Sequence, residues 1–393
     1  MPDVPTSTAP DDLSAPPEPV LPDFGGACIA NIVPALMARN GDGPPTEWLP
    51  ESARRARQVV LLVVDGLGWE QLSARAGLAP TLTSAEGIDR PITSVAPSTT
   101  ATALTSITTG RLPCEHGVLG YRLAHGDEIL NVLRWRLGNA SPRDARRSDP
   151  VRAFQPYPPF PGSPEPVPVV SRDEFGSTGF TAAHLGDSPL HGYRVPSSLP
   201  LEVGRLLGEG APFVYTYYDG IDKISHGNGL GAHYDAELRA VDRMVEDLVA
   251  VLPAGAVLVV TADHGQIDVG TRLELLGRDT MASVRFLSGE GRFRWLHARP
   301  GAGPDLVAEL TERYGDSTWV MTRDQTVEDG LFGGTPDDRL LARLGDVALL
   351  PHRPIAFIDP ADTGESRLES RHGSLTSAEM LVPLLALPGD ATI

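Results

Sequence analysis

A hydroxyl-rich, uncharged stretch at residues 96–110 has the composition of a reactive or anion-binding segment. The apolar residues that follow Pro97 recur at the spacing of a helix, at Ala101, Leu104 and Ile107. Residues 98–100 are therefore expected at a helix N-terminus, where free backbone N–H groups attract anions. A hydroxyl at that position acts as an N-cap, a phosphate ligand or a nucleophile, and the N-cap is the commonest of the three.

Acidic residues and histidines follow two long aliphatic runs. Asp65 comes directly after the run at 59–64, and Asp263 and His264 follow a second run at 256–261. Continuous apolar runs of this length are typical of buried strands in parallel sheets. Binding sites in open α/β sheets lie at the carboxyl ends of the strands, so these side chains stand where chemistry is expected. The alternative for Asp65 is a cap on the next helix.

Two further segments carry the same residue types. Asp222 and His226 follow an apolar run at 212–218, and their spacing of four lets them share one face of a helix. His372 lies in a turn-rich segment near the C-terminus. His116 stands in another loop, where its His-Gly pair is better explained by turn formation.

Together these positions give six candidate metal ligands and one hydroxyl. The ligands are Asp65, Asp222, His226, Asp263, His264 and His372. Such a set fits a phosphoryl-transfer site in which two cations about 4 Å apart hold the attacking and leaving oxygens. Zn²⁺ and Mn²⁺ both accept histidine and carboxylate ligands. A threonine alcohol becomes nucleophilic when a divalent metal lowers its pKa.

With these motifs in this order, the chain resembles the alkaline phosphatase superfamily, and within it the type I phosphodiesterase/nucleotide pyrophosphatase branch. The resemblance covers about residues 58–385. The matching motifs are Val64-Asp65-Gly66, Pro97-Ser98-Thr99-Thr100 with Thr109-Gly110 and His116-Gly117, Asp222-x-x-x-His226-Gly227, Thr261-Ala262-Asp263-His264-Gly265 and Arg371-His372-Gly373. Compact bacterial members of this branch include hydrolases of nucleotide second messengers.

The resemblance implies a role for each of these residues. It places one metal on Asp65, Thr100, Asp263 and His264, and the other on Asp222, His226 and His372. It selects Thr100 rather than Thr99 as the nucleophile, because the family has its nucleophile three residues after the proline. It also discounts Asp219, which stands seven residues before His226 where the family motif has four.

One feature of the family is missing from this chain. Better-known members carry an asparagine, further along the chain, that helps to hold the phosphoryl oxygens. Here residues 101–107, just after the nucleophile, are small, apolar or hydroxyl-bearing and include no amide. The backbone N–H of Thr100 and the metals remain to hold the phosphate. Asn228 is a speculative substitute.

The resemblance and the strand pattern predict an α/β fold with an alkaline-phosphatase-like core, a mostly parallel sheet flanked by helices, and a smaller inserted cap. The predicted divisions are a disordered, proline-rich tail at 1–24, a catalytic core at 25–265 and 351–393, and the cap at 266–350. Within them we expect an irregular excursion at 139–171, strands at 179–184 and 283–298, a helix at 304–314, and a return to the core at 354–358.

The composition limits the partners. The net charge of −18 disfavours long nucleic acid and anionic membranes, and the aliphatic run at 59–64 is too short to span a bilayer. Cys28 and Cys114 show no disulfide or zinc-knuckle spacing. Residues 1–23 contain no apolar run of the signal-peptide type. We therefore expect a cytoplasmic protein, a monomer or small homo-oligomer, with a small nucleotide or dinucleotide as substrate.

The leading hypothesis is a two-metal phosphodiesterase that acts on a nucleotide-type diester through a phosphothreonine intermediate. Cyclic di-AMP is the first guess, although no base-reading motif favours adenine over guanine. A phosphonoacetate-type phosphonate hydrolase is the alternative within the enzyme class, and a phosphomonoesterase comes third. A metal-binding pseudoenzyme or sensor is the alternative outside that class, but such a protein would have no need of Thr100.

Overall fold

The aliphatic runs of the chain form the central sheet of the protein. The computed structural model describes residues 16–38, 46–139, 141–148, 150–362 and 364–389. In these residues the sheet has the order β20-β10-β1-β9-β7-β8, with β20 antiparallel to β10 and all other pairs parallel. The strands are β1 (Gln58–Val64), β7 (Val169–Arg172), β8 (Leu190–Tyr193), β9 (Phe213–Tyr218), β10 (Ala256–Thr261) and β20 (Leu384–Pro388).

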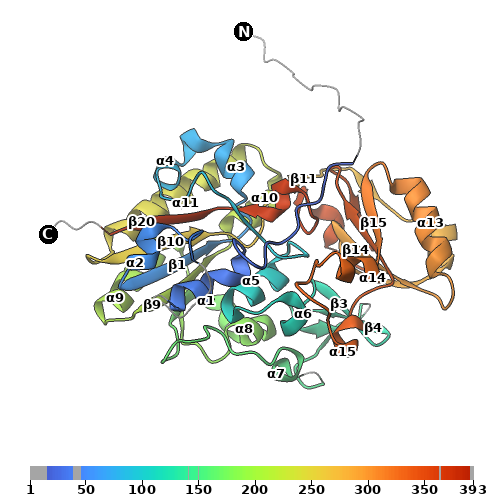
Figure 1. Ribbon diagram of the computed structural model, residues 1–393, viewed down its shortest axis with the longest axis horizontal. Helices are drawn as coiled ribbons and strands as arrows, with labels where there is room; N and C mark the ends of the chain where they lie inside the picture. The colour runs from blue at the N-terminus through green and yellow to red at the C-terminus, as the bar shows by residue number, and fades with distance from the viewer. Residues whose placement is uncertain (1–15, 39–45, 140, 149, 363, 390–393) are drawn as a thin grey trace, which may run out of the picture.

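Helices cover both faces of this sheet, as the continuous burial of its strands requires. Figure 1 shows α3 (Trp69–Ser73), α4 (Pro80–Thr83) and α11 (Ala232–Ala250) on one side, and α1 (Ile32–Met37), α5 (Thr100–Thr109) and α8 (Gly179–His184) on the other. The predicted mostly parallel α/β core is confirmed. Helix α2 (Glu51–Arg55) packs on β10 and β20, and α9 (Leu199–Gly208) and α10 (Gly220–Asn228) both pack on α11.

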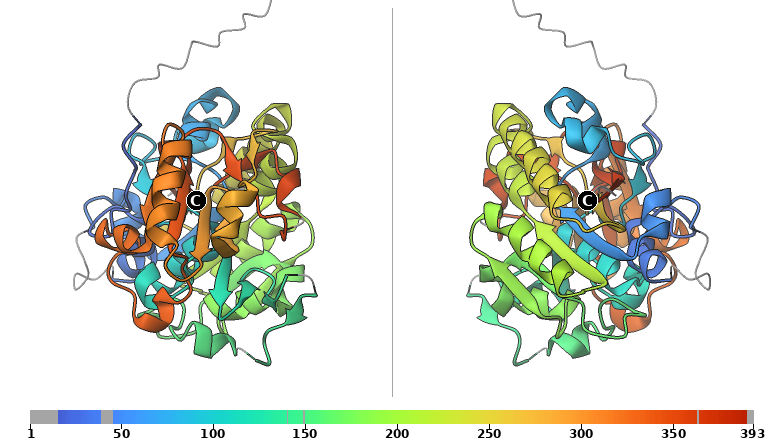
Figure 2. Two further views of the ribbon diagram at one scale, coloured as in Figure 1. Left: turned by 90° about the vertical axis from the view of Figure 1, so that its right-hand side faces the viewer. Right: turned by 90° about the vertical axis from the view of Figure 1, so that its left-hand side faces the viewer.

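A second, antiparallel sheet stands beside the first, with α13 (Gly303–Tyr314) against it (Figures 1 and 2). Its order is β13-β14-β16-β15, from β13 (Val284–Glu290), β14 (Phe293–Ala298), β15 (Thr318–Thr322) and β16 (Val347–Pro351). Leu296 packs in a small cluster with α13, whereas Phe293 and Trp295 join the main core. This alternation gives the sheet two buried faces. Its separation from the core as a cap at 266–350 stays a prediction.

Shorter elements connect these layers. An antiparallel sheet contains β3 (Arg122–His125), β4 (Glu128–Asn131), β5 (Arg136–Leu137) and β6 (Arg143–Asp144). Three strand pairs are β2 (Ile92–Thr93) with β19 (Leu381–Val382), β11 (Ile267–Asp268) with β18 (Ser370–Arg371), and β12 (Leu273–Glu274) with β17 (Ala356–Phe357). The remaining helices are α6 (Pro113–His116), α7 (Val151–Phe154), α12 (Arg278–Ala282), α14 (Arg323–Glu328), α15 (Asp338–Leu341) and α16 (Ser377–Met380), with 3₁₀ turns η1 (Ile29–Asn31), η2 (Ala76–Leu78), η3 (Asp173–Ser177), η4 (Pro196–Ser198) and η5 (Glu365–Arg367).

Three sequence expectations are wrong. Residues 179–184 form helix α8 rather than a strand, because the Thr178 side chain caps the N–H of Thr181 at 3.0 Å and starts a helix. The segment expected to be irregular over 139–171 includes most of strand β7 at its C-terminal end. The apolar run of this strand is short and follows several prolines, so the sequence did not indicate a strand. Residues 354–358, expected to return to the central core, instead contain β17, which pairs with β12 outside the central sheet.

The N-terminal tail lies partly outside the described residues, which begin at residue 16. Within them the backbone N–H of Val20 donates to the carbonyl oxygen of Leu375 at 2.8 Å. Among the described helices we find none that combines the length and the apolar character needed to cross a bilayer.

A buried ion pair joins the second sheet to the C-terminal segment. Arg292 stands between β13 and β14, and its Nη2 lies 2.6 Å from Oε2 of Glu379 on α16; both side chains are fully buried. Glu379 also accepts the N–H of Ser374 at 3.0 Å, two residues after His372. The pair therefore fixes the segment that carries His372.

We expect Glu379→Gln to lower the free energy of unfolding by about 3 kcal/mol, because it leaves the guanidinium of Arg292 buried without a counter-charge. Urea unfolding measures this loss. The matched control is Glu246→Gln on the exposed face of α11, expected to change the free energy by about 0.5 kcal/mol or less. Equal stability of the two variants would show that the pair does not hold the segment.

Candidate active site

Three carboxylates meet at the carboxyl edge of the central sheet. The register pairs Val63 with Thr261 across β1 and β10, so Asp65 and Asp263 emerge side by side, both buried. His264 Nε2 lies 3.4 Å from Asp65 Oδ1 and 3.5 Å from Asp263 Oδ2. Asp222 comes from the first turn of α10, which follows the neighbouring strand β9. Adjacent parallel strands thus bring together acids that lie far apart in the sequence.

Of the two candidate threonines, Thr100 faces this cluster. Thr99 is the extended residue before α5, and its hydroxyl donates to Glu290 Oε2 at 3.1 Å. Thr100 is the first residue of the helix, and its Oγ1 lies 3.2 Å from His264 Nε2. The Thr100 hydroxyl therefore stands between the metal-type ligands and the free N–H groups at the start of α5.

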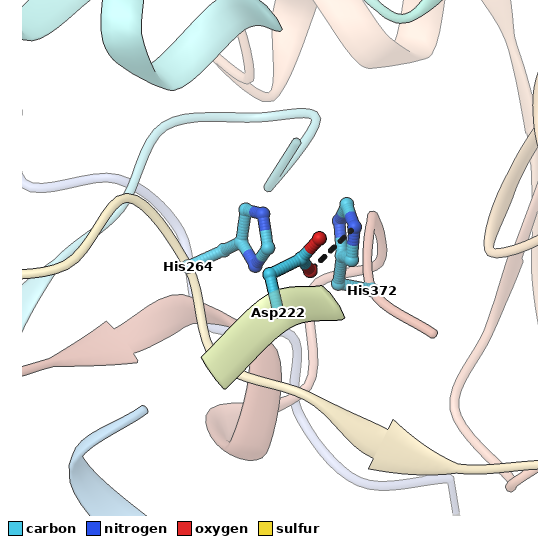
Figure 3. Close-up of side chains that lie close together, drawn as sticks. All are labelled: Asp222, His264 and His372. Carbon is cyan, nitrogen blue, oxygen red and sulfur yellow. Dashed lines mark ion pairs between the residues drawn. The ribbon is translucent and has the colours of Figure 1, made fainter. Parts of the chain in front are cut away.

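All three histidines are held in the same way. Each Nδ1 lies within hydrogen-bond distance of a backbone carbonyl oxygen, at 2.8 Å for His226 and Ser370, 3.0 Å for His264 and Gly265, and 2.9 Å for His372 and Ser98. A carbonyl only accepts, so Nδ1 carries the proton and Nε2 keeps its lone pair for a ligand. Asp222 Oδ1 lies 3.2 Å from His226 Nε2 and 3.8 Å from His372 Nε2, and Figure 3 shows Asp222 between His264 and His372.

The donor atoms of this cluster fit divalent cations. Asp65 Oδ1 and Asp263 Oδ2 are buried and have no hydrogen-bond partner among the described residues. The other oxygen of Asp65 accepts from Tyr217, and that of Asp263 accepts the N–H of Gly66 at 3.0 Å. Burial raises the pKa of Asp65, and the charges of Asp263 and Asp222 raise this pKa further. A bound cation offsets this cost, and the imidazole and carboxylate donors suit Zn²⁺ or Mn²⁺.

The predicted ligands come together in two overlapping groups. Asp65, Asp263 and His264 offer donor atoms within 4.8 Å of one another, and so do Asp222, His264 and His372. His264 thus belongs to both groups in the structure, whereas the sequence assigns it to the first. His226 joins the second group through Asp222. The sequence identified all seven positions that the structure brings together here, and their individual metal roles stay predictions.

Sequence reasoning missed the residues that orient the ligands. Gln266 donates to Asp222 Oδ1 at 2.6 Å and accepts from the Ser370 hydroxyl at 2.7 Å. Ser98 donates to the carbonyl of Ser374 at 2.8 Å and accepts the N–H of Gly373 at 3.2 Å. Ser98 lies inside a recognised motif and Gln266 directly after one, but the spacing of these two residues gives no sign of a positioning role.

Other candidates lie outside the metal cluster. Asp219 is paired with Arg172 at 2.7 Å and with Lys223 at 2.6 Å, so its charge is already balanced. His116 is fully buried, and its Nδ1 accepts the N–H of Val118 at 3.0 Å, which gives it a structural role. Asn228 is exposed at the last residue of α10, and its role as a substitute phosphate donor stays a prediction.

Two cavities meet at the nucleophile position. Thr100, Leu133 and Asp222 line both of them. The first, of about 230 Å³, is mainly apolar and aromatic, with Leu104, Phe175, Phe180, His184, Tyr215 and Tyr217 in its wall. The second, of about 520 Å³, is polar and includes Arg134, Glu290, Arg367, Arg371 and His372. A phosphorus atom beside Thr100 would therefore have room for a different substituent on each side.

Comparison with known proteins decides the family. The family model described as "Type I phosphodiesterase / nucleotide pyrophosphatase" matches residues 59–186 and 188–375. The chain belongs to this family. Its members are metal-dependent hydrolases of phosphodiester bonds, so this chain is an enzyme of that class. The match covers every motif quoted above, and the predicted family is confirmed. No curated protein matches the chain.

Solved structures show the same fold at low sequence identity. Human ectonucleotide pyrophosphatase/phosphodiesterase 5 is 14% identical, with a TM-score of 0.62 over 84% of this chain and 87% of that one. An inactive variant of the murine protein in complex with AMP is 13% identical, with a TM-score of 0.60 over 84% and 87%. Phosphonoacetate hydrolase from Sinorhizobium meliloti 1021 with phosphonoformate is 20% identical, with a TM-score of 0.57 over 86% and 93%.

We expect metal to stabilise this site. A chelator should lower the melting temperature and Zn²⁺ or Mn²⁺ should restore it, because the cations bind the folded chain preferentially. Asp263→Asn and His372→Ala should each reduce the bound metal measured by elemental analysis. The control Asp279→Asn makes the same charge change on exposed α12 and should bind metal normally. Full metal occupancy in a chain lacking both His226 and His372 would overturn the assignment.

Proposed function

We propose that the protein hydrolyses a nucleotide-type phosphodiester through a phosphothreonine intermediate, with a dinucleotide as substrate and cyclic di-AMP as the first candidate. The observation that carries this proposal is the position of Thr100, which lines both cavities. A diester has two substituents on its phosphorus, and the two cavities give each substituent a separate place. A monoester would use one of them.

The chain's own residues support covalent catalysis. The Thr100 oxygen attacks phosphorus, the bond to the leaving alcohol breaks, and water then cleaves the threonine–phosphate bond. Asp65, Asp263 and His264 would hold one metal, and Asp222, His226 and His372 the other. When bound, the two cations supply charge neutralisation for the phosphoryl oxygens and lower the pKa of the threonine hydroxyl. The first N–H groups of α5 face the same oxygens and replace part of what the missing asparagine provides.

The apolar cavity supports a nucleobase as one substituent. Phe175 and Tyr217 lie in its wall with ring centroids 6.2 Å apart and planes tilted by 55°. Aromatic walls with a few polar groups are typical of sites that bind flat heterocycles. The murine relative was solved with AMP as an inactive threonine-to-alanine variant, which supports both the nucleotide and the nucleophile by analogy. The choice of adenine over guanine rests on analogy alone.

The alternative function is phosphonate hydrolysis. It is supported by the similarity to phosphonoacetate hydrolase and by arginines in the second cavity, which suit a carboxylate. Phosphonoacetate is much smaller than the two cavities together and has no group for the aromatic one. The dinucleotide therefore accounts for more of the site.

We expect Thr100→Ala to abolish turnover while the metal content stays close to that of the unaltered protein, because six ligands remain. Hydrolysis of bis-p-nitrophenyl phosphate measures the first effect and elemental analysis the second. Thr99→Ala is the matched control, since its hydroxyl contacts Glu290 instead of the cluster. A Thr100→Ala protein that keeps more than about a tenth of kcat would contradict a covalent threonine.

The substrate is tested by incubating metal-loaded protein with cyclic di-AMP, cyclic di-GMP, linear dinucleotides, p-nitrophenyl phosphate and phosphonoacetate, followed by chromatography. We expect cyclic di-AMP to give the linear dinucleotide and then AMP. Turnover of phosphonoacetate with no cleavage of any dinucleotide would establish the alternative in its place.

A further inference from the structure

Three arginines line the polar cavity without a carboxylate partner. Arg134 and Arg367 are exposed at its wall, and neither forms an ion pair within the part of the chain that the structure describes. Arg371 is almost fully buried, with 3% of its surface accessible. An arrangement of this kind is unusual in a chain with a net charge of −18, where carboxylates are plentiful.

The guanidinium of Arg371 is incompletely satisfied. Its Nη2 donates to the backbone carbonyl of Glu365, and its Nε has no hydrogen-bond partner in the part of the chain that the structure describes. Burial lowers the pKa of Arg371, which reflects the cost of holding this charge away from water. A buried donor without a partner is costly, and an anion in the adjoining cavity would reduce that cost.

Most acidic groups in the same wall are already engaged. The carboxylate of Glu365 pairs with the buried Arg294 and accepts the N–H of Asp359. Asp362 lies 3.7 Å from the guanidinium of Arg122. Glu290 stands at the side nearest the nucleophile, where it accepts from Thr99. Among the described residues, no carboxylate of this wall forms an ion pair with any of the three arginines, so an anion in the cavity would meet guanidinium groups that no salt bridge already holds.

We propose that Arg134, Arg367 and Arg371 form a subsite for a second anionic group of the substrate, on the leaving-group side of the scissile phosphorus. This inference rests on the proposed function and deepens it. With the base of one nucleotide in the aromatic cavity, the remainder of a dinucleotide enters the polar cavity, where its second phosphate meets the arginines. Guanidinium groups bind phosphate oxygens through paired, charge-assisted hydrogen bonds.

The test compares two ligands that differ by one phosphate: a linear dinucleotide with a 5′-phosphate and the same dinucleoside monophosphate without it. Their dissociation constants are measured by calorimetry on the metal-loaded Thr100→Ala protein, which does not consume them. We expect the 5′-phosphate to tighten binding by about tenfold or more. This preference should weaken as salt is added, because the contact at the exposed arginines is screened.

Arg134→Gln and Arg367→Gln should each reduce the preference for the 5′-phosphate, and the double variant should nearly remove it. Arg55→Gln is the control, because this arginine is 79% exposed on α2 and pairs with Glu51. Bound metal is measured in each protein to exclude an indirect effect on the cluster.

The outcomes separate the two proposals. Equal affinity for the two ligands, or a preference that survives in the double variant, overturns the anion subsite and leaves the phosphodiesterase proposal standing. Failure of the protein to bind either ligand overturns both. A preference that falls in the arginine variants and persists in the control supports the subsite.

Discussion

Mutual repulsion among buried carboxylates is the constraint on which the site depends. Asp65 and Asp263 follow parallel strands that are hydrogen-bonded neighbours, β1 and β10. Asp222 lies in the first turn of the helix that follows the third strand, β9. The register of the sheet fixes their separation, so the acids cannot move apart without disrupting the core. One oxygen of each of Asp65 and Asp263 accepts a hydrogen bond. The other has no such partner among the described residues and lies near Nε2 of His264, at 3.4 Å for Asp65 and 3.5 Å for Asp263. The fold therefore holds several negative charges close together, and bound divalent cations offset the free-energy cost of burying them.

The candidate ligands must also be oriented, and contacts between segments far apart in the sequence orient them. The Ser98 hydroxyl donates to the carbonyl of Ser374 and accepts the N–H of Gly373, so it holds the loop that carries His372. His372 Nδ1 in turn donates to the carbonyl oxygen of Ser98. The buried pair of Arg292 and Glu379 holds this loop against the second sheet. The nucleophile turn and the C-terminal ligand thus form one unit. The second sheet contributes to the site in two ways. It anchors the loop of His372 through Arg292, and it places Glu290 beside Thr99.

The sequence predicted the parts of this arrangement that follow from local pattern. The aliphatic runs before Asp65 and Asp263 are typical of buried strands, and the spacing of Asp222 and His226 allowed both to share one face of a helix. The family resemblance then joined motifs that no local rule connects. Helix α8 was mistaken for a strand because its apolar residues are few and its start depends on one threonine cap. Gln266, Glu290 and the unpaired Arg371 were missed because their roles arise from contacts between distant segments, which spacing does not encode.

An acidic protein that acts on an acidic substrate needs attraction that is strong nearby and weak at long range. The net charge of −18 disfavours a polyanion, because phosphates outside the site gain no attraction from the net charge of the protein. Under the proposed function, a small diester has few charges, and these would lie near the candidate metal ligands and the arginines of the polar cavity. At physiological ionic strength, screening within about 8 Å reduces the distant repulsion far more than the contact attraction. Under the proposed function, this charge distribution would favour substrates whose anionic groups all fit inside the two cavities.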